Sequence, residues 1–387
     1  MTIAKRAWAW LPLMAGMAVV LLLSACVPDD VTVPGGSADG QKPQRFAIGF
    51  SNEFVENNMA SRTRATAGTA LSEHSTTMGV WGWRTDDVIT DEDLFIDHLV
   101  SYTPDTDWAY TPLRYWEQHS TYRFNAYAPH SSDARAAATT VSVDEASGFI
   151  SIAPITVTGD NIRTAANASH DLLNTFIASP DIDWMIAREG QRAKGDTRMK
   201  VQFVMQHILA KFNVRIRVDS VIAADEGVSA VSVDKLVISP FLSTADFTQK
   251  LNHTPDPTSA ADMAAGEWTL DDTAAAIALN GATDVTPIDD RYTYLLESLL
   301  VPQALTDDME VLLVYSFTYA DGRTEHFTYG MKLADAFGEG TLSGAEGQFV
   351  GGSSYTLSFT IEPDIISFDG GVSDWSEYVP DASHSIK

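Results

Sequence analysis

Cysteine is nearly absent from this chain: Cys26 is the single cysteine in 387 residues. One thiol excludes an intramolecular disulfide and a zinc site made of thiolates, so stability must come from apolar cores. Basic residues are also few, with 25 Lys and Arg against 52 Asp and Glu and a formal net charge of −27. Such a surface repels nucleic acid and anionic lipid headgroups, and we therefore expect no nucleic-acid partner.

Sequence motifs for catalysis and for nucleotide binding are missing as well. The chain contains no HExxH, GxSxG, GxxxxGKS/T or GxGxxG pattern and no DxDxDG-type calcium loop. Neighbouring acids such as Asp181 and Asp183 do not by themselves make the opposed carboxylates of a glycosidase. Nine histidines are scattered along the chain, and we interpret His207 and His326 as half-exposed strand residues, not as ligands. We therefore expect no catalytic residue, no cofactor and no metal ion.

The tryptophans of the first half allow two interpretations. They could form a stacking platform for sugars, or they could fill the interior of a β-sandwich, where large aromatic side chains are more often found. We favour the interior. The residues concerned are Trp81, Trp83, Trp108 and Trp116.

The residues before Cys26 have the pattern of an export signal. Lys5 and Arg6 form a short basic head, residues 7–25 carry no charge, and Leu-Ser-Ala-Cys closes the segment. Small residues followed at once by cysteine resemble a bacterial lipobox, so we predict a signal peptide over residues 1–25 and a lipid on Cys26. The alternative is an uncleaved membrane helix, because the apolar stretch approaches the roughly 20 residues that span a bilayer.

Composition suggests how the rest of the chain is divided. Residues 26–44 are rich in Pro, Gly, Asp and Ser and are predicted to be a flexible tether. Roughly 340 residues remain, a length that suits two domains. A polar, glycine-containing stretch at 188–198 marks the boundary, which predicts β-sandwich domains over 45–195 and 196–387.

Alternation of apolar and polar residues dominates after the tether and predicts half-buried strands. Residues 311–333 are predicted to be a hairpin that turns at Asp321-Gly322. Pro154 suggests that its strand lies at an edge or carries a bulge. The other predicted strands cover 122–129, 149–157, 199–207, 212–219 and 355–363.

Helical patterns are few and short. Residues 243–251 begin with Ser and Thr as possible N-cap residues, and residues 91–100 could form two to three turns. No alternation of strands with long helices occurs, so a parallel doubly wound sheet is not expected. The sequence predicts an all-β fold with a few short helices, built from antiparallel β-sandwiches.

Five stretches, taken in order, resemble the fimbrillins, the subunits of type V pili in Bacteroidota. The stretch at 203–218 is similar to their F-x-H-x-L-S/A-K-V strand, although Phe203 is out of register and Met205-Gln206-His207 directly precedes Ile-Leu-Ala-Lys. The predicted lipobox fits as well, because these pilins are exported as lipoproteins. The other matching stretches are SRTRATAGTALSEHSTTMGVWGW (61–83), YRFNAYAP (122–129), DWMIA (183–187) and YTLSFTIEPDIISFDGGVSDW (355–375).

The resemblance implies two transthyretin-like antiparallel β-sandwich domains and a mode of assembly. In the family, an Arg-specific protease trims the lipidated precursor, which removes the anchor and the first strand. The groove left in the N-terminal domain is filled by a C-terminal strand of the next subunit. Such β-augmentation satisfies the unpaired backbone groups of an open edge, and a head-to-tail contact of this kind grows into a filament.

Carried onto this chain, the removable strand is RFAIGFS (45–51), in which Phe46, Ile48 and Phe50 alternate with smaller residues. The cut would follow Arg45, Arg62 or Arg64. We favour Arg62 or Arg64, because they follow the strand in a loop-like stretch, whereas a cut after Arg45 would leave the strand in its groove. The alternative for these arginines is an uncut, solvated loop.

Two C-terminal segments are candidates for the donor strand. One is 354–362 and the other is DIISFDG (364–370), while the tail after them carries no clear strand pattern. The apolar residues of the first candidate are Tyr355, Leu357, Phe359 and Ile361.

Together these features predict a non-enzymatic, structural and adhesive pilus subunit, made as a lipoprotein precursor of the outer membrane and carried into the cell-surface fimbrium. Its expected partners are other pilus subunits, through strand addition, the outer membrane, through the lipid on Cys26, and a ligand on a host or bacterial surface. The alternative is a permanently anchored surface lipoprotein, either a pilus anchor or an adhesin for glycan or protein, that does not polymerise.

Overall fold

The computed structural model describes the chain from residue 46 to residue 374 with gaps. The described residues are 46–51, 54–56, 69–89, 92–159, 180–187, 191–195, 199–250, 266–279, 281–285, 291–337, 347–363 and 365–374. Cys26, the predicted signal peptide and the predicted tether lie outside them. No helix among the described residues is long and apolar enough to cross a membrane.

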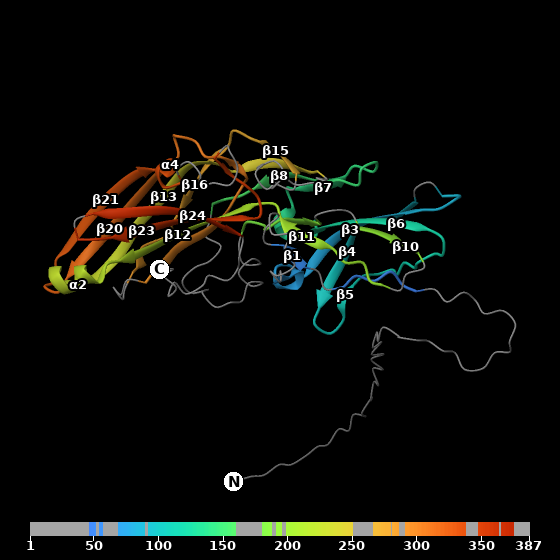
Figure 1. The fold of residues 1–387 in the computed structure, drawn as a ribbon, viewed down its shortest axis with the longest axis horizontal. Coiled ribbons are helices and arrows are strands. Elements are labelled where there is room, and N and C mark those ends of the chain that lie inside the picture. The colour runs from blue at the N-terminus through green and yellow to red at the C-terminus, as the bar shows by residue number, and fades with distance from the viewer. Residues whose placement is uncertain are drawn as a thin grey trace, which may run out of the picture. The chain divides into compact units, whose positions relative to one another are not determined.

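A nine-stranded sheet holds most of the first half of the chain (Figure 1). Its order is β2-β1-β11-β9-β6-β3-β4-β5, with β10 paired to β6 beside this path. All its ladders are antiparallel except that of β1 with β11, which is parallel. The strands are β1 (Phe54–Glu56), β2 (Thr69–Ala70), β3 (Thr77–Thr85), β4 (Glu92–Thr103), β5 (Asp107–Ala109), β6 (Thr121–Ala128), β9 (Met185–Ala187), β10 (Gln191–Lys194) and β11 (Val204–His207).

Both faces of this sheet are covered by apolar side chains, because successive residues of a strand point to opposite faces. In β6, Tyr122, Phe124 and Ala126 join one buried cluster, whereas Tyr127 joins the other. The cluster that contains Tyr127 also includes Phe247, which belongs to a second sheet with the order β15-β14-β8-β7. The strands of that sheet are β7 (Thr140–Val143), β8 (Ile150–Thr156), β14 (Thr244–Gln249) and β15 (Gly266–Leu270).

Two further sheets share a third core. The sheet β18-β12-β23-β24 contributes residues such as Phe212 and Leu357, and the sheet β16-β13-β20-β21 contributes residues such as Leu236 and Leu313. The β12–β23 ladder is parallel and the other ladders are antiparallel. The strands are β12 (Ala210–Val218), β13 (Val228–Leu242), β16 (Ala274–Ala278), β17 (Thr283–Asp284, paired to β13), β18 (Thr293–Leu300), β20 (Glu310–Tyr319), β21 (Thr324–Lys332), β23 (Ser353–Ile361) and β24 (Ile366–Asp374).

The remaining elements are short. The small ladder of β19 (Gln303–Ala304) and β22 (Gln348–Phe349) stands apart from the larger sheets. The helices among the described residues are η1 (Leu71–Glu73), η2 (Ala134–Ala136), α2 (Ser220–Glu226) and α4 (Leu333–Ala336). The predicted all-β fold with a few short helices, arranged as packed sheets, is therefore confirmed.

Two predicted helices are wrong. Residues 92–103 form β4 and residues 244–249 form β14. In β14 the buried residues are Ala245, Phe247 and Gln249, which is the period of a strand. Both segments lie beside other strands, and pairing with β3 or with β8 and β15 outweighs their weak local helix propensity.

Several finer predictions are confirmed. The hairpin of β20 and β21 turns at Gly322, whose φ of +86° suits glycine. The ladder of β8 with β14 skips a residue where Ala153 and Pro154 stand opposite Asp246, so the proline lies at a bulge. Trp81, Trp83, Trp108 and Trp116 are at most 5% exposed and belong to the core, not to a surface platform.

The sheets also connect segments from the two sides of residue 195. The β8 strand pairs with β14, and β9 pairs with β11. The predicted limits of the two domains, 45–195 and 196–387, stay a prediction.

Candidate strand-insertion site

The segment 46–51 lies between two other parts of the chain and bonds to both through its backbone. On one side it runs antiparallel to residues 114–116: the Ile48 N–H donates to the Arg114 carbonyl at 2.8 Å, and the Trp116 N–H donates to the Phe46 carbonyl at 2.9 Å. On the other side it runs parallel to Val201, whose N–H donates to the Gly49 carbonyl at 2.7 Å. The segment therefore fills a slot in which both of its edges are hydrogen-bonded.

The side chains of this segment alternate between buried and more exposed positions. Ile48 and Phe50 are 1% and 0% exposed, whereas Ala47 between Phe46 and Ile48 is exposed. Ile48 and Phe50 belong to the same core cluster as Phe124 of β6. The three residues predicted for a removable strand, Phe46, Ile48 and Phe50, thus have the burial expected of an inserted strand, with Phe46 half-buried.

Phe50 is surrounded by aromatic rings. Its ring makes edge-to-face contacts with Phe95 at 5.9 Å and with Tyr110 at 5.6 Å, and it stacks on Phe203 at 5.9 Å. Such pairs each add about 0.5–1.5 kcal/mol to the stabilisation that comes from area burial. Phe50 is therefore the main apolar anchor of the segment.

Tyr110 also holds the segment through its hydroxyl group. The O–H donates to the Ile48 carbonyl at 2.7 Å, and the Arg114 N–H donates to the hydroxyl oxygen at 3.1 Å. Burial raises the pKa of Tyr110 to about 12, so the phenol keeps its donor proton at physiological pH. One side chain thus links both members of the Ile48–Arg114 backbone pair.

The strand β1 follows the inserted segment along the chain and lies between β2 and β11. It pairs with β11 from Phe54↔Val204 to Glu56↔Gln206, and with β2 at Phe54↔Ala70. Loss of everything before residue 62 or 64 would therefore expose one edge of β11 as well as the slot beside Val201. Arg45, Arg62 and Arg64 themselves lie outside the described residues.

The two candidate donor strands occupy different positions in their sheet. Tyr355, Leu357, Phe359 and Ile361 belong to β23, a central strand between β12 and β24, and all four are at most 1% exposed. The later candidate corresponds to β24, which lies at the end of the sheet order and pairs with β23 (Figure 1). Its apolar residues Ile366, Phe368 and Val372 are only partly buried against the core.

A second group of buried polar residues lies elsewhere on the nine-stranded sheet. His74, Asp183 and His207 are 4%, 5% and 0% exposed. His207 Nδ1 lies 2.9 Å from Asp183 Oδ1, and the two imidazole rings are 5.2 Å apart at 74°. Burial raises the pKa of Asp183 to about 7, partly offset by the charges of His74, Lys211 and Arg135. The expectation that His207 is a half-exposed strand residue was therefore wrong.

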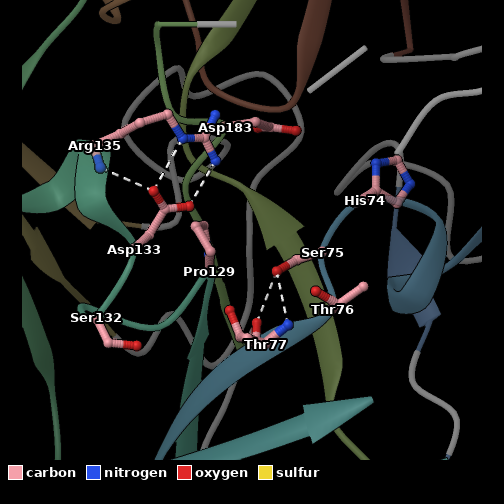
Figure 2. A pocket seen from close by; sticks show the side chains of 9 residues that line it. All are labelled: His74, Ser75, Thr76, Thr77, Pro129, Ser132, Asp133, Arg135 and Asp183. Atoms are coloured by element: carbon pink, nitrogen blue, oxygen red, sulfur yellow. Dashed lines mark hydrogen bonds and ion pairs between the residues drawn. The ribbon is translucent and has the colours of Figure 1, made fainter. Parts of the chain in front are cut away.

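This group borders a cavity of about 250 Å³, which Figure 2 shows from close by. Arg135 and Asp133 form an ion pair at 2.7 Å in its wall, and Ser75 Oγ bonds to the backbone of Thr77. Arg135 holds the pKa of Asp133 below its usual range through this contact. Two imidazoles and a carboxylate are a donor set that suits a transition metal, whereas the sequence showed only scattered histidines.

Layered β-sheets, with the segment 46–51 hydrogen-bonded along both of its edges, define a β-sandwich protein. The fimbrillin-like family model matches residues 63–375, and the chain belongs to this family. The family supports a fimbrial or adhesive subunit at the cell surface that associates with other pilus subunits. No curated protein sequence matches the chain.

Solved structures that match this chain include two from Bacteroides and Porphyromonas. A fimbrial protein from Bacteroides vulgatus is 16% identical, with a TM-score of 0.52 over 86% of this chain and 100% of that one. The tip fimbrial protein Mfa3 from Porphyromonas gingivalis is 11% identical, with a TM-score of 0.32 over 86% of this chain and 100% of that one. At these identities the first similarity supports the fold alone.

Proposed function

We propose that this chain is a structural and adhesive subunit of a type V pilus, exported as an outer-membrane lipoprotein precursor and assembled by donor-strand exchange. The observation that carries the proposal is the inserted segment 46–51. Its backbone bonds to residues on both sides, and Ile48 and Phe50 fill the core, yet the segment precedes the body of the fold. A strand held in this way can be replaced by another strand with the same alternation of side chains.

The proposed trigger is a cut after Arg62 or Arg64. It would release the segment 46–51 and β1 together with the lipid on Cys26, leaving the slot and one edge of β11 open. A cut after Arg45 would release the lipid but leave the slot occupied. Open strand edges are templates for pairing with another chain, so the exposed slot would accept a strand from the next subunit.

Of the two candidate donors, we propose β24. Removal of β23 would break two ladders and take four buried apolar side chains out of the core. Removal of β24 breaks one described ladder and frees Ile366 and Phe368, whose spacing repeats that of Ile48 and Phe50. The donor would therefore offer the slot two large apolar residues at the same separation.

The proteolytic step is tested by N-terminal sequencing and intact mass of the protein from outer membranes and from sheared surface material. We expect sheared, SDS-resistant multimers whose chains begin just after Arg62 or Arg64. The double variant Arg62→Gln/Arg64→Gln should remain membrane-bound and monomeric, while the matched Arg45→Gln variant should polymerise like the wild type. Only monomers beginning at an acylated Cys26 would contradict the proposal and favour a permanent anchor.

The donor assignment is tested separately by Phe368→Asp. Phe368 is half-buried, so the monomer should still fold, but a carboxylate cannot enter the apolar slot that Phe50 leaves. We expect multimer formation to fall by at least about tenfold, which corresponds to 1.4 kcal/mol. The control is Asp369→Ser on the exposed face of the same strand, which should assemble normally. Unchanged assembly of folded Phe368→Asp would exclude β24 as the donor.

A further inference from the structure

His74, Asp183 and His207 come from three separate segments that the fold brings together. His74 directly follows η1, Asp183 precedes β9, and His207 ends β11. One potential ligand atom from each residue lies within 4.8 Å of the other two. A tetrahedral zinc ion with bonds of about 2.0–2.2 Å needs ligand atoms roughly 3.3 Å apart, so rotations of these side chains would close the set around an ion.

Asp183 supplies an independent sign that something binds here. Its carboxylate is 5% exposed, and Oδ1 lies 2.9 Å from His207 Nδ1. Oδ2 is buried and has no hydrogen-bond partner among the described residues. A buried carboxylate oxygen without a donor is costly, and such atoms in folded proteins generally face an ion or an ordered water.

The cavity gives an ion a route and room for further ligands. Its walls include His74 and Asp183 themselves, so the group is buried in the protein but borders open space (Figure 2). Ser75, Thr77 and Ser132 contribute further polar groups to the walls. A volume of about 250 Å³ admits the water that would complete a site with three protein ligands.

We propose that His74, Asp183 and His207 bind a divalent transition-metal ion, with Zn²⁺ as the preferred ion. Two imidazole nitrogens and one carboxylate oxygen suit zinc, whereas calcium and magnesium prefer sites made wholly of oxygen. A chain with one cysteine cannot supply several thiolate ligands, and these three residues offer nitrogen and oxygen ligands instead.

The position of the site suggests what the ion does. Residues 69–74 join the nine-stranded sheet through β2, whose described partner is β1. In the proposed maturation, on which this role rests, β1 leaves, and an ion shared by His74 and His207 would tie the new N-terminal region directly to β11. The ion would therefore keep the start of the mature chain docked during strand exchange.

The site itself is tested on the intact, uncut chain, so its failure and that of the pilus proposal are distinguishable. The full chain, carrying a tag without histidine, is titrated with Zn²⁺ by calorimetry and with Co²⁺ by visible absorption. We expect one equivalent of bound Zn²⁺, a d–d band typical of Co²⁺ with nitrogen and oxygen ligands, and a rise in Tm that EDTA reverses. A folded wild-type chain with neither Zn²⁺ heat nor a Co²⁺ band would overturn the proposal.

The variants locate the ion. Asp183→Asn and His74→Gln keep the side-chain size and should each weaken Zn²⁺ binding by at least about 100-fold. His326→Gln is the matched control, because His326 is exposed and lies 3.1 Å from Asp234 in another histidine–aspartate pair; it should bind like the wild type. If Asp183→Asn fails to fold, His74→Gln decides the question, since His74 borders the cavity. Wild-type affinity in folded His74→Gln would also overturn the proposal.

Discussion

Phe50→Ala should lower the free energy of unfolding of the uncut chain by about 3–5 kcal/mol, the range measured for truncating fully buried aromatic residues. Phe50 is 0% exposed and contacts the rings of Phe95, Tyr110, Phe124 and Phe203. The substitution removes these contacts and leaves a cavity that β-sheet backbones on several sides cannot readily close. Urea denaturation followed by tryptophan fluorescence measures the change.

Ala47→Ser is the matched control for Phe50→Ala, because Ala47 is exposed and lies in the same segment. It should change the free energy of unfolding by less than about 0.5 kcal/mol. The two variants together separate the apolar anchoring of the segment from any general sensitivity of the N-terminal region. If Phe50→Ala lowers the free energy of unfolding by less than about 1 kcal/mol, burial of Phe50 in the slot contributes little to stability. That result would remove the main support for strand exchange.

Lys211→Met should be comparably destabilising, by about 3–5 kcal/mol, because it removes the ammonium group that faces the buried carboxylate of Glu297. Lys211 Nζ lies 2.8 Å from Glu297 Oε1, and the two side chains are 1% and 5% exposed. They come from the adjacent strands β12 and β18. Thermal and urea denaturation at neutral pH measure the loss.

A second substitution distinguishes loss of the charge–charge attraction from loss of packing. The double variant Lys211→Met/Glu297→Gln should recover a large part of the loss, since neutral buried groups can replace a buried ion pair with little change in stability. Lys200→Met is the matched control: its ion pair with Asp107 at 3.0 Å is half-exposed, and such pairs contribute about 0–1 kcal/mol. Equal losses in the single and double variants would refute an electrostatic cause.

The strands were predictable where one face of a segment meets the core. Val214, Ile216 and Val218 of β12 are all buried, as their alternation predicts, and the Asp321-Gly322 turn is in the expected place. In β23 the alternation is weaker evidence, because Ser358 and Thr360 on the other face are also buried. A central strand and a half-exposed strand therefore had nearly the same sequence pattern, and the donor candidates could not be ranked without the strand order.

The errors have a different origin. The β4 segment contains Asp and Glu residues among apolar ones, a pattern that a short helix and a bulged strand share, and the β3 partner decides between them. The His74, Asp183 and His207 group had no local signal, because its members are far apart in the chain and meet only through the order of β11 and β9. Pairing between strands is a long-range property, and motif spacing does not report it.

The direct succession of β11 and β12 along the chain has a mechanical consequence. Val201, which borders the slot, lies three residues before β11, and β12 begins three residues after His207, at Ala210. The β12 strand is held by eight register pairs to β23, which in turn carries β24. In a filament joined by β24, a pulling force would enter a subunit at its slot. It would pass along the backbone from β11 to β12, and then across the β12–β23 and β23–β24 ladders to the β24 of the same subunit. The subunit would then bear the load through many hydrogen bonds at once, without any covalent crosslink.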